Sequence, residues 1–216
     1  MMYQIRELKL DEIRAIYNSR MTRDFPADEL KPLKMIEDAI ARNEYISYGI
    51  LEEDEILGYA YLAYARVPQG RRYLFDYLGV REDLRGTGIG SILLHQLPEI
   101  LPEPECILGE VENPDYAQTD KERAMQERRI AFYERNDIAD TGVTCRLYNV
   151  EYRVMEQPVG GRIHTSEEAH TLYTELYRAI LPADKFKTML QIHDLTDGGR
   201  AVQAGRQTGE EGHVLS

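Results

Sequence analysis

A glycine-rich turn between an apolar strand and an apolar helix constrains the fold of this chain more than any other feature. The segment over residues 80–94 reads Val-Arg-Glu-Asp-Leu-Arg-Gly-Thr-Gly-Ile-Gly-Ser-Ile-Leu-Leu. Gly86, Gly88 and Gly90 let the backbone approach a bound group closely, and the N–H groups at the start of the following helix favour an anion there. The turn therefore predicts a cradle for a pyrophosphate.

The composition is typical of a globular protein with one main domain. The chain has 216 residues, of which 43% are apolar, enough for a sizeable core. The N-terminus lacks the apolar stretch of a secretory signal and no run approaches a membrane span, so we expect a cytoplasmic protein that binds no membrane. Cys106 and Cys145 fall within expected strands, which favours buried thiols. Without suitably spaced histidines they form no zinc site, and no metal is expected.

The net charge restricts the choice of partners. A formal charge of −12 argues against nucleic acid, because phosphate contacts need clustered lysines and arginines. The acidity suits a cationic substrate, although an acidic surface also serves solubility alone.

The hydrophobic pattern predicts an α+β fold built on a mainly antiparallel sheet with one parallel crossover. Strands are expected at residues 2–8, 45–51, 56–65, 73–80, 106–112, 143–148 and 150–155. Helices are expected at residues 10–17, at 28–42, at 89–97 with Pro98 ending the helix, and over a segment that ends at 128–135.

The C-terminal third predicts a helical arm joined to this domain. Gly160 and Gly161 are a candidate hinge, and Thr165-Ser-Glu-Glu168 forms a capping box that starts a helix. The arm covers either its own sheet, which we favour, or a partner subunit, so a monomer and a homodimer both remain open. We therefore expect a domain over residues 1–160, a helical extension over 161–193 and a polar, flexible tail over 194–216.

Three phosphate-binding folds contain a glycine-rich turn of this kind. A P-loop requires a lysine after its last glycine, and none lies near residues 86–91, which excludes it. A dinucleotide fingerprint requires Gly-x-Gly-x-x-Gly, whereas here Ser91 takes the place of the third glycine. Glu110 and Glu112 lie about where that fold places its ribose-binding acid, but several strands and helices precede the turn, which argues against a first βα unit.

The third possibility is an acyl-CoA cradle, in which Arg/Gln-x-x-Gly-x-Gly/Ala opens a helix after a strand. Arg85-Gly-Thr-Gly88-Ile-Gly90 matches this pattern, and Phe132-Tyr133-Glu-Arg-Asn follows about forty residues later. With these two motifs in this order, the chain from about residue 2 to 157 resembles the GNAT acetyltransferase superfamily, especially bacterial members of unassigned substrate.

The resemblance implies where the cofactor, acetyl-CoA, lies. In this family the fourth strand splays from the fifth, and the pantetheine arm hydrogen-bonds to the fourth strand. The pyrophosphate lies on the amides of the glycine turn, with hydroxyls and an arginine as further donors. The matching positions are Leu78, Gly79 and Val80 for the arm, and Arg85, Gly86, Thr87, Gly88, Ile89, Gly90 and Ser91 for the pyrophosphate. For the Thr87 and Ser91 hydroxyls, helix capping is an equal alternative.

The resemblance also implies catalytic residues. Tyr133 matches the family's tyrosine beside the acetyl-CoA sulfur, where a phenol can protonate the departing thiolate, although a core role is the alternative. An amine acceptor must lose a proton. Glu110 is the candidate base, with Glu112 as a partner that attracts the cation, since two-residue spacing places both on one strand face. A chain of water molecules is the alternative base, and a substrate-pocket or structural role is the alternative for either carboxylate.

Substrate contacts are expected from two further regions. Asp76 and Tyr77 on the fourth strand are second candidates for the acceptor site, and Phe25 and Arg20 lie in the loop region that lines the family's acceptor pocket. Phe25 beside a proline also suits a structural staple between helices.

These residues predict an acetyl-CoA-dependent N-acetyltransferase that moves an acetyl group to a primary amine, a small molecule or a peptide, by direct attack in a ternary complex. Two alternatives remain: a non-catalytic acyl-CoA-binding or regulatory module, and a dinucleotide-binding protein.

Overall fold

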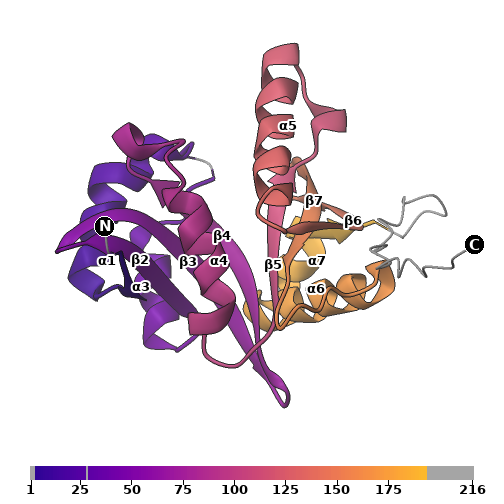
Figure 1. Ribbon diagram of the computed structural model, residues 1–216. Coiled ribbons are helices and arrows are strands. Elements are labelled where there is room, and N and C mark those ends of the chain that lie inside the picture. Colours follow the sequence, from indigo (N-terminus) through magenta and orange to yellow (C-terminus); the bar gives the residue numbers. More distant parts are fainter. Residues whose placement is uncertain (1–2, 28, 194–216) are drawn as a thin grey trace, which may run out of the picture.

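The computed structural model describes residues 3–27 and 29–193, and within them one mixed sheet organises the fold (Figure 1). The spatial order of its strands is β1-β2-β3-β4-β5-β7-β6-β8, with only the β4–β5 pair parallel among the described residues. The strands are β1 Gln4–Glu7, β2 Tyr45–Glu52, β3 Glu55–Val67, β4 Gly70–Val80, β5 Pro104–Glu112, β6 Ala139–Leu147, β7 Val150–Gln157 and β8 Leu190–Ile192.

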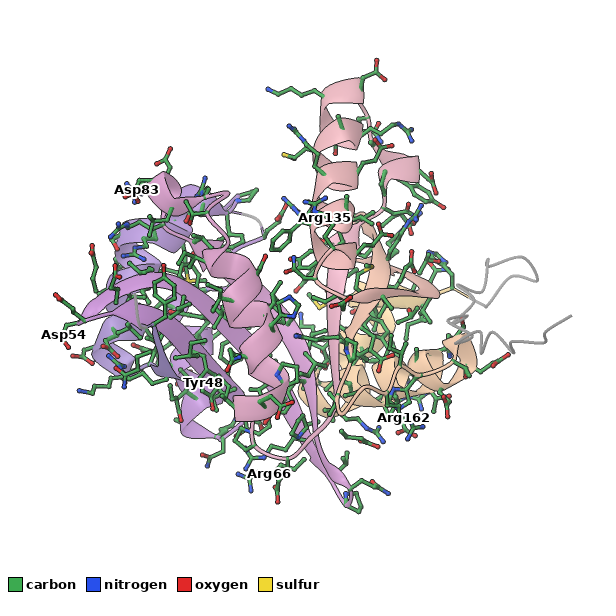
Figure 2. The ribbon with its side chains drawn as sticks, viewed as in Figure 1. Tyr48, Asp54, Arg66, Asp83, Arg135 and Arg162 are labelled. Atoms are coloured by element: carbon green, nitrogen blue, oxygen red, sulfur yellow. The ribbon has the colours of Figure 1, made fainter. Side chains whose placement is uncertain are left out.

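Helices cover both faces of this sheet. They are α1 Leu10–Ile16, α2 Thr22–Asp24, α3 Leu33–Ala41, α4 Ile89–Ile100, α5 Asp120–Glu134, α6 Ser166–Ile180 and α7 Ala183–Met189, with a π-helical turn at Tyr17–Met21 and 3-10 turns at Glu82–Leu84 and Pro114–Tyr116. One apolar cluster joins the sheet to α4 and α5, and the other joins it to α1, α3 and α6. We call these the α4/α5 face and the α1/α6 face (Figures 1 and 2).

The two central strands pair over only part of their length. β4 and β5 are in register from Arg71 opposite Pro104 to Phe75 opposite Gly109. Beyond that point β4 pairs only with β3, and β5 pairs only with β7. The strands therefore separate into a fork, as the family resemblance implied, and the fork exposes residues of both strands that a continuous sheet would cover.

A β-bulge lies where the fork begins. Tyr61 on β3 pairs with Tyr77, whereas the next residue, Leu62, pairs with Phe75, so Asp76 is the extra residue. A bulge shifts the alternation of side chains by one. Asp76 and Tyr77 consequently both contact groups on the α1/α6 face, instead of pointing to opposite sides.

Three details of the predicted elements were wrong. α3 begins at Leu33, not at residue 28, because Pro32 serves as its N-cap and the preceding segment forms turns. α4 continues through Pro98 to Ile100. A proline there leaves the Leu94 carbonyl without its helical donor, and the side-chain amide of Gln157 donates to that carbonyl instead. The sequence also gave no sign of β8, which pairs with β6.

The C-terminal segment packs on the sheet of its own chain. Thr165 and Glu168 form the predicted capping box at the start of α6. The inner side of α6 buries apolar and aromatic side chains in the α1/α6 cluster: Ala169, Leu172, Tyr173, Leu176 and Tyr177. The tail over residues 194–216 lies outside the described residues.

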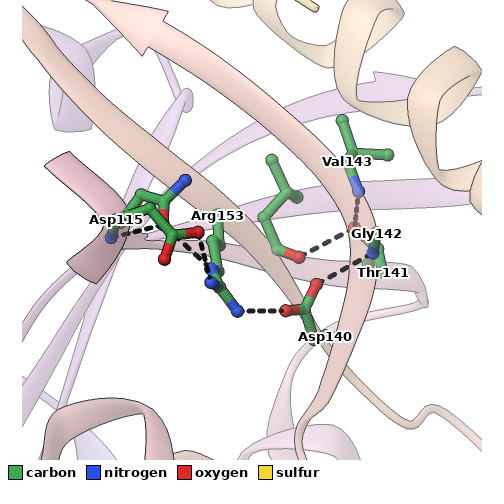
Figure 3. A network of polar contacts seen from close by, with 8 residues as sticks. Asp115, Asp140, Thr141, Gly142, Val143 and Arg153 are labelled. Atoms are coloured by element: carbon green, nitrogen blue, oxygen red, sulfur yellow. Dashed lines mark hydrogen bonds and ion pairs between the residues drawn. The ribbon is translucent and has the colours of Figure 1, made fainter. Parts of the chain in front are cut away.

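A polar network fixes the end of β5 against β6 and β7 (Figure 3). The Arg153 guanidinium on β7 donates to Asn113, 3.1 Å from its side-chain oxygen, and pairs with Asp115 at 3.0 Å and Asp140 at 3.5 Å. Asp140 also accepts from the Gly142 amide at 2.8 Å, where β6 bulges. These contacts hold one arm of the fork in place.

Candidate active site

The glycine turn has the open backbone that an anion cradle requires. Gly86 and Gly88 have φ of 81° and 94°, and a β-carbon built on either would meet nothing within 4 Å. Gly88 is the N-cap of α4 and contributes no side chain to capping. The amides of the first helical turn are therefore available to a bound phosphate.

The side chains around the turn brace it. The Thr87 hydroxyl donates to the Leu84 carbonyl at 2.6 Å. The Arg85 guanidinium forms an ion pair with Asp24 at 2.7 Å, which links the turn to α2. Backbone amides thus remain the main donors that the turn offers.

α5 brings Phe132 and Tyr133 to the same face as the turn. A β-carbon on Gly90 would lie 3.5 Å from Cζ of Phe132, so a glycine there allows α4 and α5 to approach. The Phe132 and Tyr133 rings meet edge to face with centroids 5.4 Å apart. Burial raises the pKa of the Tyr133 phenol, and the nearby Arg129 guanidinium opposes that rise. Tyr133 is therefore a neutral proton donor at physiological pH.

Glu110 lies on the opposite, α1/α6 face, one residue beyond the last β4–β5 pair. The hydroxyls of Tyr173 and Tyr177 on α6 both donate to its Oε1, the latter at 2.5 Å. Burial raises the pKa of the Glu110 carboxyl, whereas the two tyrosine hydrogen bonds lower it. A carboxylate whose pKa is raised toward neutrality is suited to accept a proton.

Asp76 forms a second acidic group beside Glu110. Its carboxylate binds the Lys31 ammonium at 2.5 Å and accepts a hydrogen bond from the Tyr45 hydroxyl at 2.5 Å. The Asp76 charge raises the pKa of Glu110, and the Lys31 charge lowers it, so the three groups act on one another. The Asp76–Lys31 ion pair is therefore the charged group nearest in effect on Glu110 that the structure identifies.

Three other expected residues have different neighbours. Glu112 forms an ion pair with Arg129 of α5, so the structure does not join it to Glu110 in one cluster. Phe25 packs edge to face on Tyr77, with centroids 4.9 Å apart, and the Tyr77 hydroxyl donates to the Glu29 carbonyl at 3.0 Å. Phe25 and Tyr77 thereby attach the loop after α2 to the mouth of the fork.

Comparison with known proteins identifies this architecture. The profile of the Acetyltransferase (GNAT) family matches residues 10–136, more than half of the chain. The chain belongs to the GNAT family. As a GNAT protein it is an acyltransferase that depends on acetyl-CoA. No curated protein sequence matches it closely enough to count as a relative.

Solved structures of GNAT proteins share the fold at low sequence identity. A Bacteroides thetaiotaomicron protein described as a GNAT-family acetyltransferase is 19% identical, with a TM-score of 0.59 over 82% of this chain and 97% of that one. Arabidopsis thaliana NAA60, solved with acetyl-CoA, is 13% identical, with a TM-score of 0.55 over 74% of this chain and 100% of that one. Arabidopsis thaliana Naa50, solved with the bisubstrate analogue CoA-Ac-MVNAL, is 20% identical, with a TM-score of 0.53 over 73% and 99%.

Sequence reasoning missed four side chains of this GNAT site: Lys31, Tyr45, Tyr173 and Tyr177. Tyr173 and Tyr177 of α6 are four residues apart, a spacing typical of core packing on an apolar helix face. Their polar partner, Glu110, is more than sixty residues away in sequence.

In the part of the chain that the structure describes, no helix is long and apolar enough to cross a membrane.

Proposed function

We propose that this GNAT protein transfers an acetyl group from acetyl-CoA to a primary amine by direct attack, with the donor on the α4/α5 face of the fork and the acceptor on the α1/α6 face. The observation that carries the proposal is the position of Glu110 and Tyr133. Glu110 follows the last β4–β5 pair and is held by two tyrosines of the α1/α6 cluster, whereas Tyr133 packs on the α4/α5 cluster. This arrangement suits a base for the acceptor on one face and an acid for the leaving group on the other.

The residues present fit acetyl-CoA. The open turn at Gly86 and Gly88 leaves the first-turn amides of α4 accessible to the pyrophosphate. Leu78 and Val80 face the α4/α5 cluster on the unpaired arm of β4, where backbone groups can hold the pantetheine arm. Acetyl-CoA supplies an activated thioester to this site.

Glu110 takes a proton from the acceptor ammonium, which frees the nitrogen lone pair to form the new bond to the acetyl carbon. An ionised Glu110 carboxylate attracts that ammonium, whereas the Asp76 charge is already paired with Lys31. Tyr133 donates a proton to the sulfur as the carbon–sulfur bond breaks, and the acylated nitrogen loses its second proton to solvent, from which the Tyr133 phenolate regains one. The products are an acetamide and free CoA, and the proton held by Glu110 is released to solvent.

The extension over residues 161–193 is then part of the catalytic site, because α6 supplies both hydroxyls that hold Glu110. Two structural neighbours point to different classes of acceptor. The Naa50 structure contains the bisubstrate analogue CoA-Ac-MVNAL. A Vibrio cholerae protein described as a spermidine N-acetyltransferase is 15% identical, with a TM-score of 0.51 over 72% of this chain and 92% of that one. Charge alone does not choose between these classes of acceptor.

The test is to mix the full chain with acetyl-CoA and a panel of amines and to detect acetylated products by mass spectrometry. Transfer to at least one primary amine, lost in Glu110→Gln, supports the proposal. Tight CoA binding with no transfer to any amine would favour the regulatory module instead. Stronger stabilisation by NAD than by CoA would contradict both.

A further inference from the structure

A cavity of about 330 Å³ lies between the helices at the N-terminus and the turn before the glycines. Its lining is charged: Arg20, Arg23, Asp24, Arg81, Glu82 and Asp83. Asp83, labelled in Figure 2, marks this part of the molecule. The volume is within the range of small-ligand sites.

Two buried donors have no hydrogen-bond partner among the described residues, one on Arg20, which lines the cavity, and one on Tyr59, which lies behind this lining and interacts electrostatically with Arg20 and Asp24. They are Nη1 of Arg20 and the Tyr59 hydroxyl. The charges of Asp24, Arg20 and Arg85 all act on the Tyr59 phenol, and burial raises its pKa, so it is a neutral donor. Buried donors without an acceptor are rare, because each loses its bonds to water. An arginine and a neutral hydroxyl together are suited to an anionic oxygen.

Gly79 brings the Tyr59 hydroxyl to the fork. A β-carbon at Gly79 would lie 2.2 Å from Cζ and 2.4 Å from the hydroxyl oxygen of Tyr59. The Tyr59 ring therefore crosses β4 in the space that a side chain at Gly79 would fill. Its hydroxyl reaches the unpaired arm of β4 on the α1/α6 face, the side of the fork that holds Glu110.

Two cations in this part of the molecule are already paired. Arg81 forms ion pairs with Asp83 at 2.7 Å and with Glu55, and Arg85 pairs with Asp24. Within the described residues, Arg20 and Arg23 form no ion pair at contact distance, although the Arg81 hydrogen bond and, more weakly, the Arg20 charge lower the pKa of Asp83. Of these two cations, Arg20 has the buried and unpartnered Nη1 and is the better placed to meet a ligand.

From this arrangement we propose that Arg20 and Tyr59 bind an anionic group, a carboxylate or a phosphate, on the acceptor amine. The proposal rests on the proposed function and names the class of its acceptor. The cavity lies outside the cofactor cradle, because none of the residues from Gly86 to Gly90 lines it. Gly79 lies three positions after Asp76 on β4, about 10 Å along an extended strand. We therefore choose acceptor probes whose amine and anion are about 10 Å apart, the length of three extended residues.

The experiment uses matched acceptors and the full chain. Trialanine with a free carboxylate is compared with trialanine amide and with an aminoalkyl phosphate of the same span, and binding in the presence of CoA is measured by calorimetry. We expect one or both anions to bind on the order of tenfold or more tightly than the amide. The carboxylate and phosphate arms identify which anion is preferred. Equal binding of all three probes would overturn the proposal.

Variants assign the effect to the cavity. Arg20→Gln should abolish the preference for the anion, and Tyr59→Phe should reduce it severalfold. Arg14→Gln, an exposed position on α1 paired with Glu37, should retain it. An Arg20→Gln variant that loses CoA affinity while its acceptor preference is unchanged would assign the cavity to the cofactor and refute the idea. Because binding is measured without transfer, anion selectivity without any acetylated product would count against the proposed function alone.

Discussion

The Tyr177 hydroxyl donates a hydrogen bond of 2.5 Å to Oε1 of Glu110, although the two residues are 67 positions apart in the chain. Tyr173 donates to the same oxygen. The carboxylate proposed to act as base is therefore positioned by the C-terminal helix, which lies beyond the family match that ends at residue 136.

Tyr177→Phe should shift the acid limb of the pH–rate profile to higher pH. The tyrosine hydrogen bond lowers the pKa of Glu110, so its removal raises that pKa, and the base becomes protonated at a higher pH. The measurement is kcat/KM against pH with an accepted amine, with the exposed Tyr148→Phe as control. An acid limb that does not move would remove Tyr177 from a positioning role.

Glu110→Gln should stabilise the fold at neutral pH while it abolishes transfer. The folded-state pKa of Glu110 is raised, so the wild type loses stability as pH rises from the unfolded value of about 4.3 through the folded pKa. Glutamine keeps an acceptor for both tyrosines and carries no charge. The difference in Tm between Glu110→Gln and the wild type should therefore grow from acid to neutral pH. In a chain of this size, each kcal/mol of difference in the free energy of unfolding corresponds to roughly 2–4 °C in Tm. A constant difference across pH would contradict the raised pKa.

Tyr133→Phe should lower kcat roughly 10- to 100-fold and leave the Kd for acetyl-CoA nearly unchanged, because only a proton donor is removed from a well-packed ring. Stopped assays give kcat, and calorimetry gives the Kd. Phe132→Leu is the matched control for packing, since that side chain contacts Gly90 and lacks a hydroxyl. Unchanged turnover in Tyr133→Phe would exclude the tyrosine from the mechanism.

Gly79→Ala should destabilise the fold by about 1–3 kcal/mol, the usual effect of overpacking. The added carbon would lie 2.2 Å from the Tyr59 ring. In a Tyr59→Ala background the same change should cost much less, and thermal unfolding of the four variants gives the coupling. Gly86→Ala is the comparison: its φ of 81° brings backbone strain but no clash, so Tyr59→Ala should not relieve it. Additive effects of the changes at positions 79 and 59 would show that the contact is unimportant.

Local patterns in the sequence were enough to predict the sheet, the glycine turn and the capping box at Thr165. Each of these is set by residues close together in the chain, such as glycines that permit positive φ or a hydroxyl three residues before an acid. The order of the elements then separated the acyl-CoA cradle from a dinucleotide fold.

The features that sequence patterns did not predict depend on pairs of residues that are far apart in the chain. Pro98 normally ends a helix, and only the amide of Gln157, 59 positions later, explains why it does not. The bulge at Asp76 depends on which β3 residues face it. Likewise, periodicity gives α6 an apolar face but does not indicate that two of its tyrosines meet a glutamate.

The hydrogen bonds from α6 to Glu110 also determine when this site can form during protein synthesis. The ribosome synthesises the strands of the fork and the glycine turn before it synthesises Tyr173 and Tyr177. Protein domains tend to fold from the N-terminus during synthesis. The nascent chain can thus assemble a cradle for its acyl donor while the base still lacks its partners. If Glu110 is the base, as proposed, it acquires both tyrosine partners only when synthesis has passed residue 177 and α6 has docked.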